Sequence, residues 1–449
     1  MIVLGLGSNT GDRLQNLRHA YYLLQKNPDF KIESVSPVYQ SQAQLPNHVP
    51  LEWNRPYFNT AIRCSTMLKP TVALKALQTI EVNMGRDAQH AHWSPRVIDI
   101  DILFWSDYPS INTQELTLPH PFLFKRPFAL WPLEDVVPEK IMVNLIDSTT
   151  GETAHAIAKS WGSKFAQQSA PFDTYQINHR IDTPSIRGIV NATPNSFSDG
   201  GKYLDPEPAL QKSIELFNAG ADILDIGAES TRPNNTDTLS TEAQWQRLKP
   251  ILHDLNNYWR GKIFRPKISV DTRCPIVAEK ALHFDVDFIN DVTGFTNPLM
   301  LDVVKDSLVE LVFMHHLSVP PRANETLPLL QDPIQVMKQW AMDRLQVFSD
   351  RNISHKRLIF DPGIGFGKTP HQNMEIIKRA NELESIGLPI LIAHSRKSFL
   401  KQFIDLPAAR RDIETVILSN YLSQRNIHYL RVHHVDWAMR SFKVLKTLL

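Results

Sequence analysis

The second half of this 449-residue chain repeats one pattern eight times, and this repetition constrains the fold more than any other feature. Short apolar runs alternate with amphipathic helical patterns over about 260 residues, which is the length and rhythm of a (β/α)8 barrel. We therefore predict a TIM barrel over residues 184–449. The runs that we interpret as its strands are 188–190, 222–226, 267–270, 286–289, 311–314, 358–360, 389–393 and 429–432.

A polar or charged residue follows nearly every one of these runs. In such barrels the catalytic groups lie at the carboxyl ends of the strands, so we expect these side chains to surround one active site. Helix N-caps alone would explain one or two of them, but not a nearly complete ring. In chain order they are Asn191, Asp225 with Glu229, Asp271, Asn290 with Asp291, His315, Asp361, Ser395-Arg396-Lys397, and Arg431 with His433.

The chemistry of this ring suits a flat heterocycle that carries an anionic group. Asp271 and Asp361 end apolar strands and could accept N–H bonds from a heterocycle such as a pterin. The cationic donors are numerous enough to hold a diphosphate. These donors are Arg232, Lys397, Arg431 and His433.

The first half has a different element order. Residues 2–6, 32–39, 57–64 and 97–103 are predicted to be strands, and two helices complete the order strand–helix–strand–strand–helix–strand. This order is the split motif of ferredoxin-like α+β domains, which we predict for residues 1–160. Residues 161–183 carry scattered aromatic residues among small and polar ones. We interpret them as a linker that packs on a surface.

The last of these strands carries two acids. Asp99 and Asp101 alternate with aliphatic residues, so both carboxylates should project from one face, about 7 Å apart. Neighbouring carboxylates repel each other unless a cation lies between them, and Mg²⁺ binds one or two carboxylates together with phosphate oxygens. Arg86 and Arg96 are close in the sequence. We predict a magnesium and phosphate site, with solvated acids on an edge strand as the alternative.

The composition bears on partners and compartment. The 48 Lys and Arg residues nearly balance 47 Asp and Glu residues, so no bulk field would attract nucleic acid or an anionic membrane. Cys64 and Cys274 are far apart and lack metal-type spacing, which indicates a reducing compartment. Because the chain begins with a short apolar strand, we expect neither a signal peptide nor a membrane helix. We expect a cytoplasmic enzyme that binds small molecules.

Six motifs of the first half occur in the order found in 6-hydroxymethyl-7,8-dihydropterin pyrophosphokinase, which residues 1–155 resemble. The resemblance implies transfer of diphosphate from ATP to the pterin hydroxymethyl group, with release of AMP, at two magnesium ions held by Asp99 and Asp101. The motifs are G-x-G-S-N from Gly5, Y-x-N from Tyr57, Gly85-Arg86, W-x-P-R-x-x-D-x-D from Trp93, L-P-H from Leu118 and F-x-x-W-P-L from Phe128.

The same resemblance implies a role for each matching residue. Tyr57 and Phe128 would stack on the two faces of the pterin, and Asn59 would bind its polar edge. Arginine side chains would neutralise phosphate charge during the transfer. The residues implied for ATP are Gln78, Arg86, Arg96 and His120.

Two positions depart from that family. Ala88 and His92 stand where members commonly carry arginine, and an imidazole is mostly neutral near pH 7. We expect slower catalysis or altered loop closure, without loss of activity. A degenerate regulatory module that binds nucleotide or pterin is the alternative for this half.

The second half resembles dihydropteroate synthase over residues 185–449. The resemblance implies condensation of dihydropterin-methyl diphosphate with 4-aminobenzoate, which releases diphosphate. Sulfonamides occupy the aminobenzoate site in this family, and pairing through the last helices is common, so a homodimer is also implied. The motifs are N-A-T-P-N-S-F-S-D-G-G from Asn191, E-S-T-R-P from Glu229, D-P-G-I-G-F-G-K from Asp361, S-R-K-S from Ser395 and R-V-H from Arg431.

The implied ligand residues of the barrel fall into three groups. One magnesium ion would lie at Asn191 with the diphosphate, and Asp271, Asp361 and Lys397 are the catalytic candidates. The groups are Asp271, Asn290, Asp361 and Lys397 for the pterin, Asn191, Arg232, Arg431 and His433 for the diphosphate, and Thr231, Pro233, Phe366 and Ser398 for aminobenzoate.

The alternative for the barrel is a pterin-binding methyltransferase module, which would not need a cationic cage for diphosphate. Departures from the synthase pattern are modest: Asn195 stands where Asp is frequent, and His434 where Asp is common. Since the first half would make the diphosphate ester that the second half needs, we favour a bifunctional folate-pathway enzyme. Its substrates would be ATP, hydroxymethyldihydropterin and 4-aminobenzoate.

Overall fold

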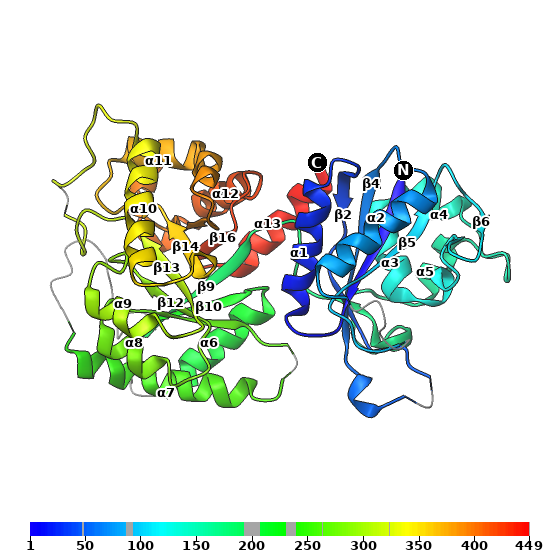
Figure 1. Cartoon of the computed structure of the whole chain (residues 1–449), viewed down its shortest axis with the longest axis horizontal. Coiled ribbons are helices and arrows are strands. Elements are labelled where there is room, and N and C mark those ends of the chain that lie inside the picture. The colour runs from blue at the N-terminus through cyan, green and yellow to red at the C-terminus, as the bar shows by residue number, and fades with distance from the viewer. Residues whose placement is uncertain are drawn as a thin grey trace. The chain divides into compact units, whose positions relative to one another are not determined.

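The computed structural model describes residues 1–46, 49–86, 93–192, 207–229, 239–262, 264–322 and 324–448. By its contacts the chain divides into two compact units, Met1–Asp182 and Thr183–Leu449. Figure 1 shows the elements of both units. Each unit has a buried hydrophobic core of its own.

The first unit is built on an antiparallel sheet in the order β5-β1-β4-β3-β8, with β2 also paired to β4. Helix α1 (Arg13–Lys26) follows β1, and α2 (Pro70–Asn83) follows β4. The predicted α+β order is therefore confirmed. The strands are β1 (Ile2–Ser8), β2 (Lys31–Val35), β3 (Tyr39–Ser41), β4 (Tyr57–Ser65), β5 (Asp99–Trp105) and β8 (Tyr175–Gln176).

The strand predicted over 32–39 is interrupted. Pro37 lies between β2 and β3, and because proline has no N–H it cannot continue the ladder on β4. Five further elements of this unit lie between β5 and β8. They are β6 (Ile111–Asn112), β7 (Thr117–Leu118), α3 (Pro127–Val136), α4 (Glu139–Asn144) and α5 (Ala154–Ser160).

Different helices cover the two faces of this sheet. Val3 and Leu103 pack with Leu130 and Trp131 of α3 in one buried cluster. Since side chains alternate along a strand, the fully buried Ile2 and its even-numbered neighbours in β1 face the other side, where α1 and α2 lie against the sheet. The site described below lies on the face that α3 covers.

Residues 161–183 were predicted to be a linker, but the first unit extends to Asp182 and includes residues 161–182. In β8, Tyr175 pairs with Gln40 of β3. Further along, the Ile177 N–H donates to the Val38 carbonyl at 2.9 Å, and Arg180 donates to the Val35 carbonyl at 2.6 Å. The segment therefore forms an edge of the sheet.

The second unit is an eight-stranded parallel sheet in the order β14-β13-β12-β11-β10-β9-β16-β15. A single bridge between Phe360 and Ile390 joins the two ends, so the barrel is nearly closed. All eight predicted strands are confirmed. They are β9 (Ser185–Asn191), β10 (Ile223–Gly227), β11 (Lys267–Asp271), β12 (Phe288–Asp291), β13 (Glu310–Met314), β14 (Leu358–Asp361), β15 (Leu391–Ile392) and β16 (Tyr429–Val432).

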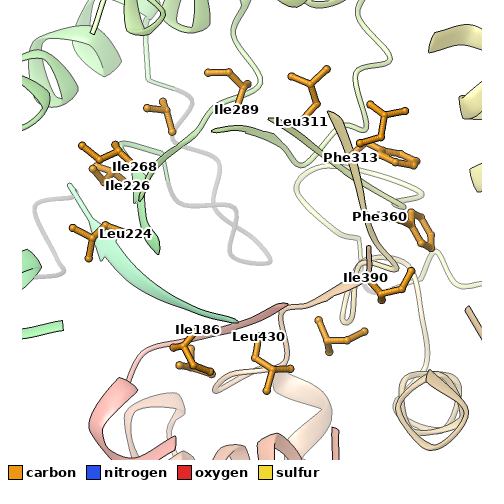
Figure 2. Packing of buried hydrophobic residues seen from close by; sticks show 14 of the residues in the cluster. Ile186, Leu224, Ile226, Ile268, Ile289, Leu311, Phe313, Phe360, Ile390 and Leu430 are labelled. Atoms are coloured by element: carbon orange, nitrogen blue, oxygen red, sulfur yellow. The ribbon is translucent and has the colours of Figure 1, made fainter. Parts of the chain in front are cut away.

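Helices surround this barrel, and the strands turn alternate residues toward them. Figure 2 shows Leu224, Ile226 and Ile268 pointing out of the ring of strands. Because side chains alternate, Asp225 and Asp271 point into the barrel. The helices are α6 (Glu207–Asn218), α7 (Thr241–Trp259), α8 (Pro275–Ala281), α9 (Pro298–Val304), α10 (Pro333–Asp350), α11 (Pro370–Lys378), α12 (Asp412–Ser423) and α13 (Val435–Leu448).

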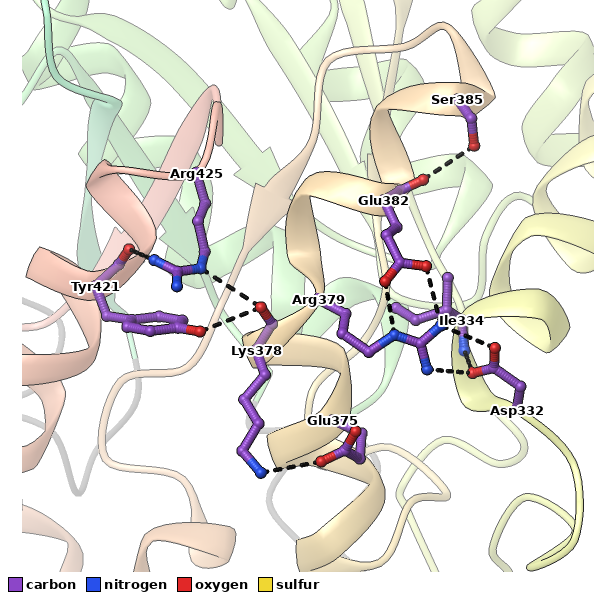
Figure 3. A network of polar contacts seen from close by, with 9 residues as sticks. All are labelled: Asp332, Ile334, Glu375, Lys378, Arg379, Glu382, Ser385, Tyr421 and Arg425. Atoms are coloured by element: carbon purple, nitrogen blue, oxygen red, sulfur yellow. Dashed lines mark hydrogen bonds and ion pairs between the residues drawn. The ribbon is translucent and has the colours of Figure 1, made fainter.

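Ion pairs tie some of the outer helices together at the surface (Figure 3). Arg379, after α11, binds both Asp332 at the N-cap of α10 and Glu382 through paired contacts of 2.7–2.9 Å. Arg425 and Tyr421 both donate to the Lys378 carbonyl. No helix in the described stretches is both long and apolar enough to cross a membrane.

Candidate functional site

The candidate site of the first unit lies where β1, β4 and β5 run side by side. In the ladder, Asp99 is opposite Gly7 of β1 and Asp101 is opposite Gly5. A Cβ at Gly7 would lie only 3.3 Å from the Asn59 Oδ1 atom and 3.6 Å from the ring of Tyr57. The glycine therefore keeps the face open between the acid pair and the two ligand candidates of β4.

Two arginines neutralise one of the acids. Arg96 donates from Nη1 to Asp99 Oδ1 at 2.7 Å, and the Nη1 atom of Arg86 lies 3.2 Å from the same oxygen. Arg86 also pairs with the buried Glu81. Glu81 is fixed in turn because its Oε1 accepts the Ile100 N–H at 2.8 Å. The structure thus brings the predicted acids and phosphate-binding arginines together.

Asp101 is the open member of the pair. Desolvation, with the nearby carboxylates of Asp99 and Glu81, raises the pKa of Asp101 to about 7. Its side chain is nevertheless 46% exposed, so a ligand can reach the carboxylate. A cation between the two acids would remove this repulsion.

The donor set fits magnesium bound together with phosphate. Within the described ranges, no group of three or more His, Cys, Asp and Glu side chains is placed to hold a metal ion. Mg²⁺ does not need such a group, since one or two carboxylates suffice when substrate phosphates and water complete its shell. The pair formed by Asp99 and Asp101 meets that requirement.

Of the two aromatic candidates, Tyr57 lies close to this acid pair. Tyr57 is half-buried, and its hydroxyl is close enough to Arg96 and Asp99 to interact with their charges. Asn59 donates from Nδ2 to Ser41 Oγ at 3.0 Å, which fixes the orientation of its amide. Phe128 is half-buried at the start of α3.

Two ATP candidates occupy different environments. His120 Nε2 lies 3.9 Å from Asp101 Oδ2, and burial, with the Arg126 charge, lowers the pKa of His120 to about 4. This imidazole is therefore neutral near pH 7. Gln78 is exposed on α2. Ala88 and His92 lie outside the described residues.

Arg126 is a site residue that the sequence reasoning missed. Its guanidinium lies 4.4 Å from the ring centroid of Phe122 and 5.7 Å from that of Phe128. Its Nε donates to Gln44 Oε1 at 2.9 Å, and the charge of Asp101 acts on it. Its place between the L-P-H motif and Phe128 is the sequence signal that could have identified it.

In the second unit an arginine lies between two acids inside the barrel. Arg431 donates from Nε to Asp225 Oδ2, and from Nη2 to Asp271 Oδ2 at 3.0 Å. Asn290 donates to the same Asp225 oxygen at 3.4 Å. Burial would raise the pKa of Asp225, but Arg431 and then Arg187 lower it. Burial raises the pKa of Asp271 to about 7 against the opposing charge of Arg431.

Arg187, which sequence reasoning also missed, lies below this centre. It is fully buried and donates to Ser269 Oγ at 3.2 Å, with Asp225 Oδ1 3.8 Å away. Its guanidinium stacks 4.3 Å from the ring centroid of Phe288. A single Arg directly before the first predicted run, 188–190, gives no motif, so only the alternation of β9 could have indicated that its side chain points inward.

Lys397 reaches into the barrel from the loop after β15. Its Nζ donates to the Ile364 carbonyl at 2.5 Å and lies 4.7 Å from the ring centroid of Phe366. Burial lowers the pKa of Lys397 to about 8, although Asp361 opposes this shift. Asp361 is itself buried and accepts the Gly363 N–H at 2.7 Å. The predicted pterin group therefore gathers at one mouth of the barrel.

The glycine-rich loop that carries Phe366 is braced from inside. The buried Lys368 donates to the carbonyls of Gly363 and Phe366 at 3.0 and 2.9 Å, and its Nζ lies 3.0 Å from His315 Nδ1. Lys368 is thus a structural brace of the loop that follows β14.

The start of α12 fixes the loop that carries Lys397. Arg396 has a left-handed backbone (φ 58°) and binds Asp412 through two contacts of 2.7 and 2.8 Å. Arg411 donates to the carbonyls of Arg396 and Lys397 at 3.2 Å each. His434 Nε2 lies 3.5 Å from the same Asp412 carboxylate. Asp412 therefore provides a carboxylate close to the position where the sequence lacks the common Asp.

The remaining barrel candidates are placed as follows. Ser395 Oγ lies 2.8 Å from His433 Nδ1, which orients that imidazole at the end of β16. Asn191 ends β9, and Ser398 is exposed just beyond Lys397. The predicted aminobenzoate residues Thr231 and Pro233, with Arg232, lie outside the described residues, as does Asn195.

Two family profiles match this chain. One described as 7,8-dihydro-6-hydroxymethylpterin-pyrophosphokinase matches residues 3–138. The other, described as pterin binding enzyme, matches residues 187–433. Each match lies within one of the two units.

Relatives named folate synthesis bifunctional protein align with nearly the whole chain. The protein from Chlamydia caviae is 34% identical over 440 residues, which are 98% of this chain and 96% of the relative. One from Arabidopsis thaliana is 33% identical over 465 residues, which are 97% of this chain and 93% of the relative.

Solved dihydropteroate synthases resemble a part of the chain. The structure from Anaplasma phagocytophilum with bound 6-hydroxymethylpterin-monophosphate is 30% identical, with a TM-score of 0.53, and covers 60% of this chain and 100% of its own. The structure from Yersinia pestis in complex with a sulfonamide drug is 28% identical, with a TM-score of 0.55, and covers 60% and 96%.

Proposed function

Because this chain belongs to the folate synthesis bifunctional proteins, we propose how its two sites divide the two reactions. The chain is an enzyme with hydroxymethyldihydropterin pyrophosphokinase and dihydropteroate synthase activities in folate biosynthesis. This membership disfavours both a regulatory first half and a methyltransferase barrel. The observation that carries the division is that each unit has its own cluster of acids paired with arginines.

In the first unit, Asp99 and Asp101 would hold two magnesium ions, which supply charge neutralisation at the phosphate oxygens of ATP. Arg86 and Arg96 would then move from Asp99 to the phosphates. The pterin hydroxymethyl oxygen would attack the β-phosphorus of ATP and lose its proton to water, the bond from that phosphorus to the α-phosphate oxygen would break, and AMP would leave. Both arginines lie within 3.2 Å of Asp99, which supports this assignment because their guanidinium groups are already beside the predicted metal site.

The pterin of this reaction would lie between Tyr57 and Phe128, with its polar edge on Asn59. The half-buried state of both rings supports this assignment, because each has surface left for a flat ligand. His120, neutral beside Asp101, and Gln78 are assigned to ATP. A neutral imidazole can donate one hydrogen bond and accept another there.

In the second unit, Asp271, Asn290, Asp361 and Lys397 would bind the pterin of the diphosphate ester. Asp361 is buried and its pKa is raised by that burial, so it suits a hydrogen bond to a heterocyclic N–H. The aminobenzoate site is assigned to Thr231, Pro233, Phe366 and Ser398. The sulfonamide complex of the Yersinia pestis enzyme supports the inference that sulfonamides compete with aminobenzoate here.

The diphosphate would be held by cationic residues and one magnesium ion at Asn191. Diphosphate leaves with the electron pair of the C–O bond, and the resonance-stabilised pterin cation that results is attacked by the arylamine nitrogen, which then loses a proton. The residues assigned to diphosphate are Asn191, Arg232, Arg431 and His433.

We also propose a homodimer through α12 and α13. Ile413 and Ile417 of α12, with Trp437 and Val444 of α13, are large apolar side chains that are between 44% and 66% exposed. Their burial against a second copy would remove this surface from water. Light scattering should give twice the monomer mass, and Ile417→Glu should give the monomer.

The expected cytoplasmic location stays a prediction, and a relative from Pisum sativum is named mitochondrial.

The test of both activities is one reaction with purified protein, magnesium, ATP, 6-hydroxymethyl-dihydropterin and 4-aminobenzoate. Mass spectrometry and phosphorus NMR should detect AMP, free diphosphate and dihydropteroate together. Accumulation of the diphosphate ester would refute the synthase assignment. If no AMP formed, the kinase assignment would fail, and the barrel would be tested with supplied ester.

A further inference from the structure

The last part of the first unit, residues 161–182, is the junction segment, and one of its side chains reaches the candidate pterin site. Phe172 has a left-handed backbone, with φ 58° and ψ 26°. This conformation is uncommon for a bulky residue and persists only where surrounding contacts hold it. The contacts of Phe172 therefore show which neighbouring residues stabilise this conformation.

The ring of Phe172 packs edge-to-face on Phe128. The two ring centroids are 5.5 Å apart and the planes are 69° apart. The Arg126 guanidinium lies 5.7 Å from the Phe128 centroid. Since edge-to-face pairs have a preferred geometry, Phe172 restricts the plane that the Phe128 ring can present to a ligand.

The backbone of Phe172 makes a second connection to the same site. Its carbonyl accepts the Gln42 N–H at 2.7 Å. Two residues further on, Gln44 accepts the Nε of Arg126, which lies beside the Phe128 ring. Phe172 thus contacts the aromatic wall directly and also anchors the strand end that leads to Gln44.

Hydrogen bonds on both sides keep Phe172 in place. The Gln168 N–H donates to Asp173 Oδ1 at 2.6 Å, and the fully buried Thr174 donates to the Pro171 carbonyl at 2.8 Å. Beyond them, Gln40 donates to the Tyr175 hydroxyl at 2.9 Å. The left-handed turn is therefore part of a fixed structure.

We infer that Phe172 is a positioning residue of the pterin site in the first unit, acting through Phe128. On this inference the junction segment contributes to pterin binding in the pyrophosphokinase and also connects the first unit to the barrel. This inference rests on the proposed stacking of pterin on Phe128.

The test compares Phe172→Ala, Phe172→Leu and Phe172→Tyr in the full chain, with separate KM values for pterin and for ATP in AMP formation. Phe172→Ala should raise the pterin KM roughly two- to tenfold, which is the fold-change expected for one aromatic pair. Phe172→Tyr should retain the native KM for pterin, whereas Phe172→Leu should raise it. The KM for ATP should stay unchanged, as should dihydropteroate formation from supplied ester.

Phe165→Ala is the matched control, because Phe165 belongs to the same segment but is 73% exposed. It should leave both KM values unchanged. Equal changes in the KM values for pterin and ATP, or full rescue by Phe172→Leu, would mean that Phe172 only packs, and the inference would be overturned.

Calorimetric titration with 6-hydroxymethyl-dihydropterin separates this inference from the proposed function. If the native protein made no AMP, the kinase assignment would fail, and pterin affinity would still decide the role of Phe172. An affinity of Phe172→Ala equal to the native one would overturn the inference, whereas a weaker affinity that Phe172→Tyr restores would support it.

Discussion

Burial shifts the pKa of single residues in both sites, and for Asp101 the neighbouring carboxylates of Asp99 and Glu81 add to the shift. It raises the pKa of Asp101 and of Asp271 to about 7 each, and it lowers the pKa of Lys397 to about 8. A group whose pKa lies near 7 or 8 changes its protonation state readily when a charged ligand binds, because the charge of the ligand shifts that pKa. Acids beside the predicted metal site and the lysine of the barrel are therefore the residues to change first.

We predict that Asp99→Asn combined with Asp101→Asn stops AMP formation. The loss should be at least about a hundredfold, because metal neutralisation of transferring phosphate contributes several kcal/mol. Dihydropteroate formation from supplied ester should remain native. AMP formation near the native rate in the double variant would refute the metal assignment.

We predict that the KM of the barrel for its pterin substrate rises above pH about 8, as Lys397 loses its proton. The unfolded chain keeps that proton up to the ordinary lysine value of 10.5, so stability should rise with pH between these values while substrate binding weakens. A rise in the free energy of unfolding together with a rise in KM would show that the weaker binding comes from titration of Lys397 and not from unfolding. Lys397→Arg, charged throughout, should abolish the alkaline rise in KM, and an unchanged rise would exclude Lys397 as its source.

Alternation along the strands explains how much of the barrel could be predicted. Leu224 and Ile226 must face the helices, so Asp225 must face the interior, and the same parity orients Asp271 and Arg431. The polar residues that follow the apolar strands could thus be predicted to form one site. The hydrogen bond that Arg396 donates to Asp412 could not be predicted, because no local pattern links the start of a helix to a loop.

The features that could not be predicted from the sequence lie mostly in short elements without periodicity. The two-residue strand β8 leaves no alternation to detect, and its pairing with β3 depends on residues more than 130 positions away. Arg126 lay between two motifs and carried none itself. Such contacts are set by tertiary packing, which overrides local propensity.

The turn after β14 gives a prediction for one element. Gly363 has φ +66°, and a Cβ there would lie 1.9 Å from the His315 carbonyl oxygen, whereas Gly387 has φ +79° and open space around it. Gly387→Ala should lower the free energy of unfolding by about 1 kcal/mol through backbone strain alone. Gly363→Ala should lower it by about 3 kcal/mol or more and impair the synthase. Urea denaturation checks both, and equal losses would contradict the steric argument.

At the scale of the whole molecule, the chain is two enzymes with separate cores. Length and the change of element order predicted two domains. Residues 161–182 were harder to assign, because their attachment to the first unit rests on long-range contacts such as that of Lys164 with Asp135 of α3 at 2.7 Å. A boundary chosen by motifs alone would remove these contacts.

We predict that a fragment of residues 1–182 folds and forms AMP, whereas one of residues 1–160 melts at lower temperature and has a higher KM for pterin. The shorter fragment lacks β8, Phe172 and the ion pair of Lys164. Circular dichroism melts and AMP assays check this. Equal melting temperatures and KM values would show that the junction segment contributes nothing to the first unit.

The arginine that lies between two acids has a further consequence for turnover. In the free barrel, Arg431 is already engaged by Asp225 and Asp271, so an incoming anion must compete with internal carboxylates for it. Weakly charged anions would displace them poorly, and a diphosphate would do so best. In the role proposed for Arg431, the same carboxylates would bind the arginine again after the reaction and so favour release of the diphosphate product. On that proposal, Asp225 and Asp271 would act as internal competitors of the diphosphate product and would limit its affinity for the barrel.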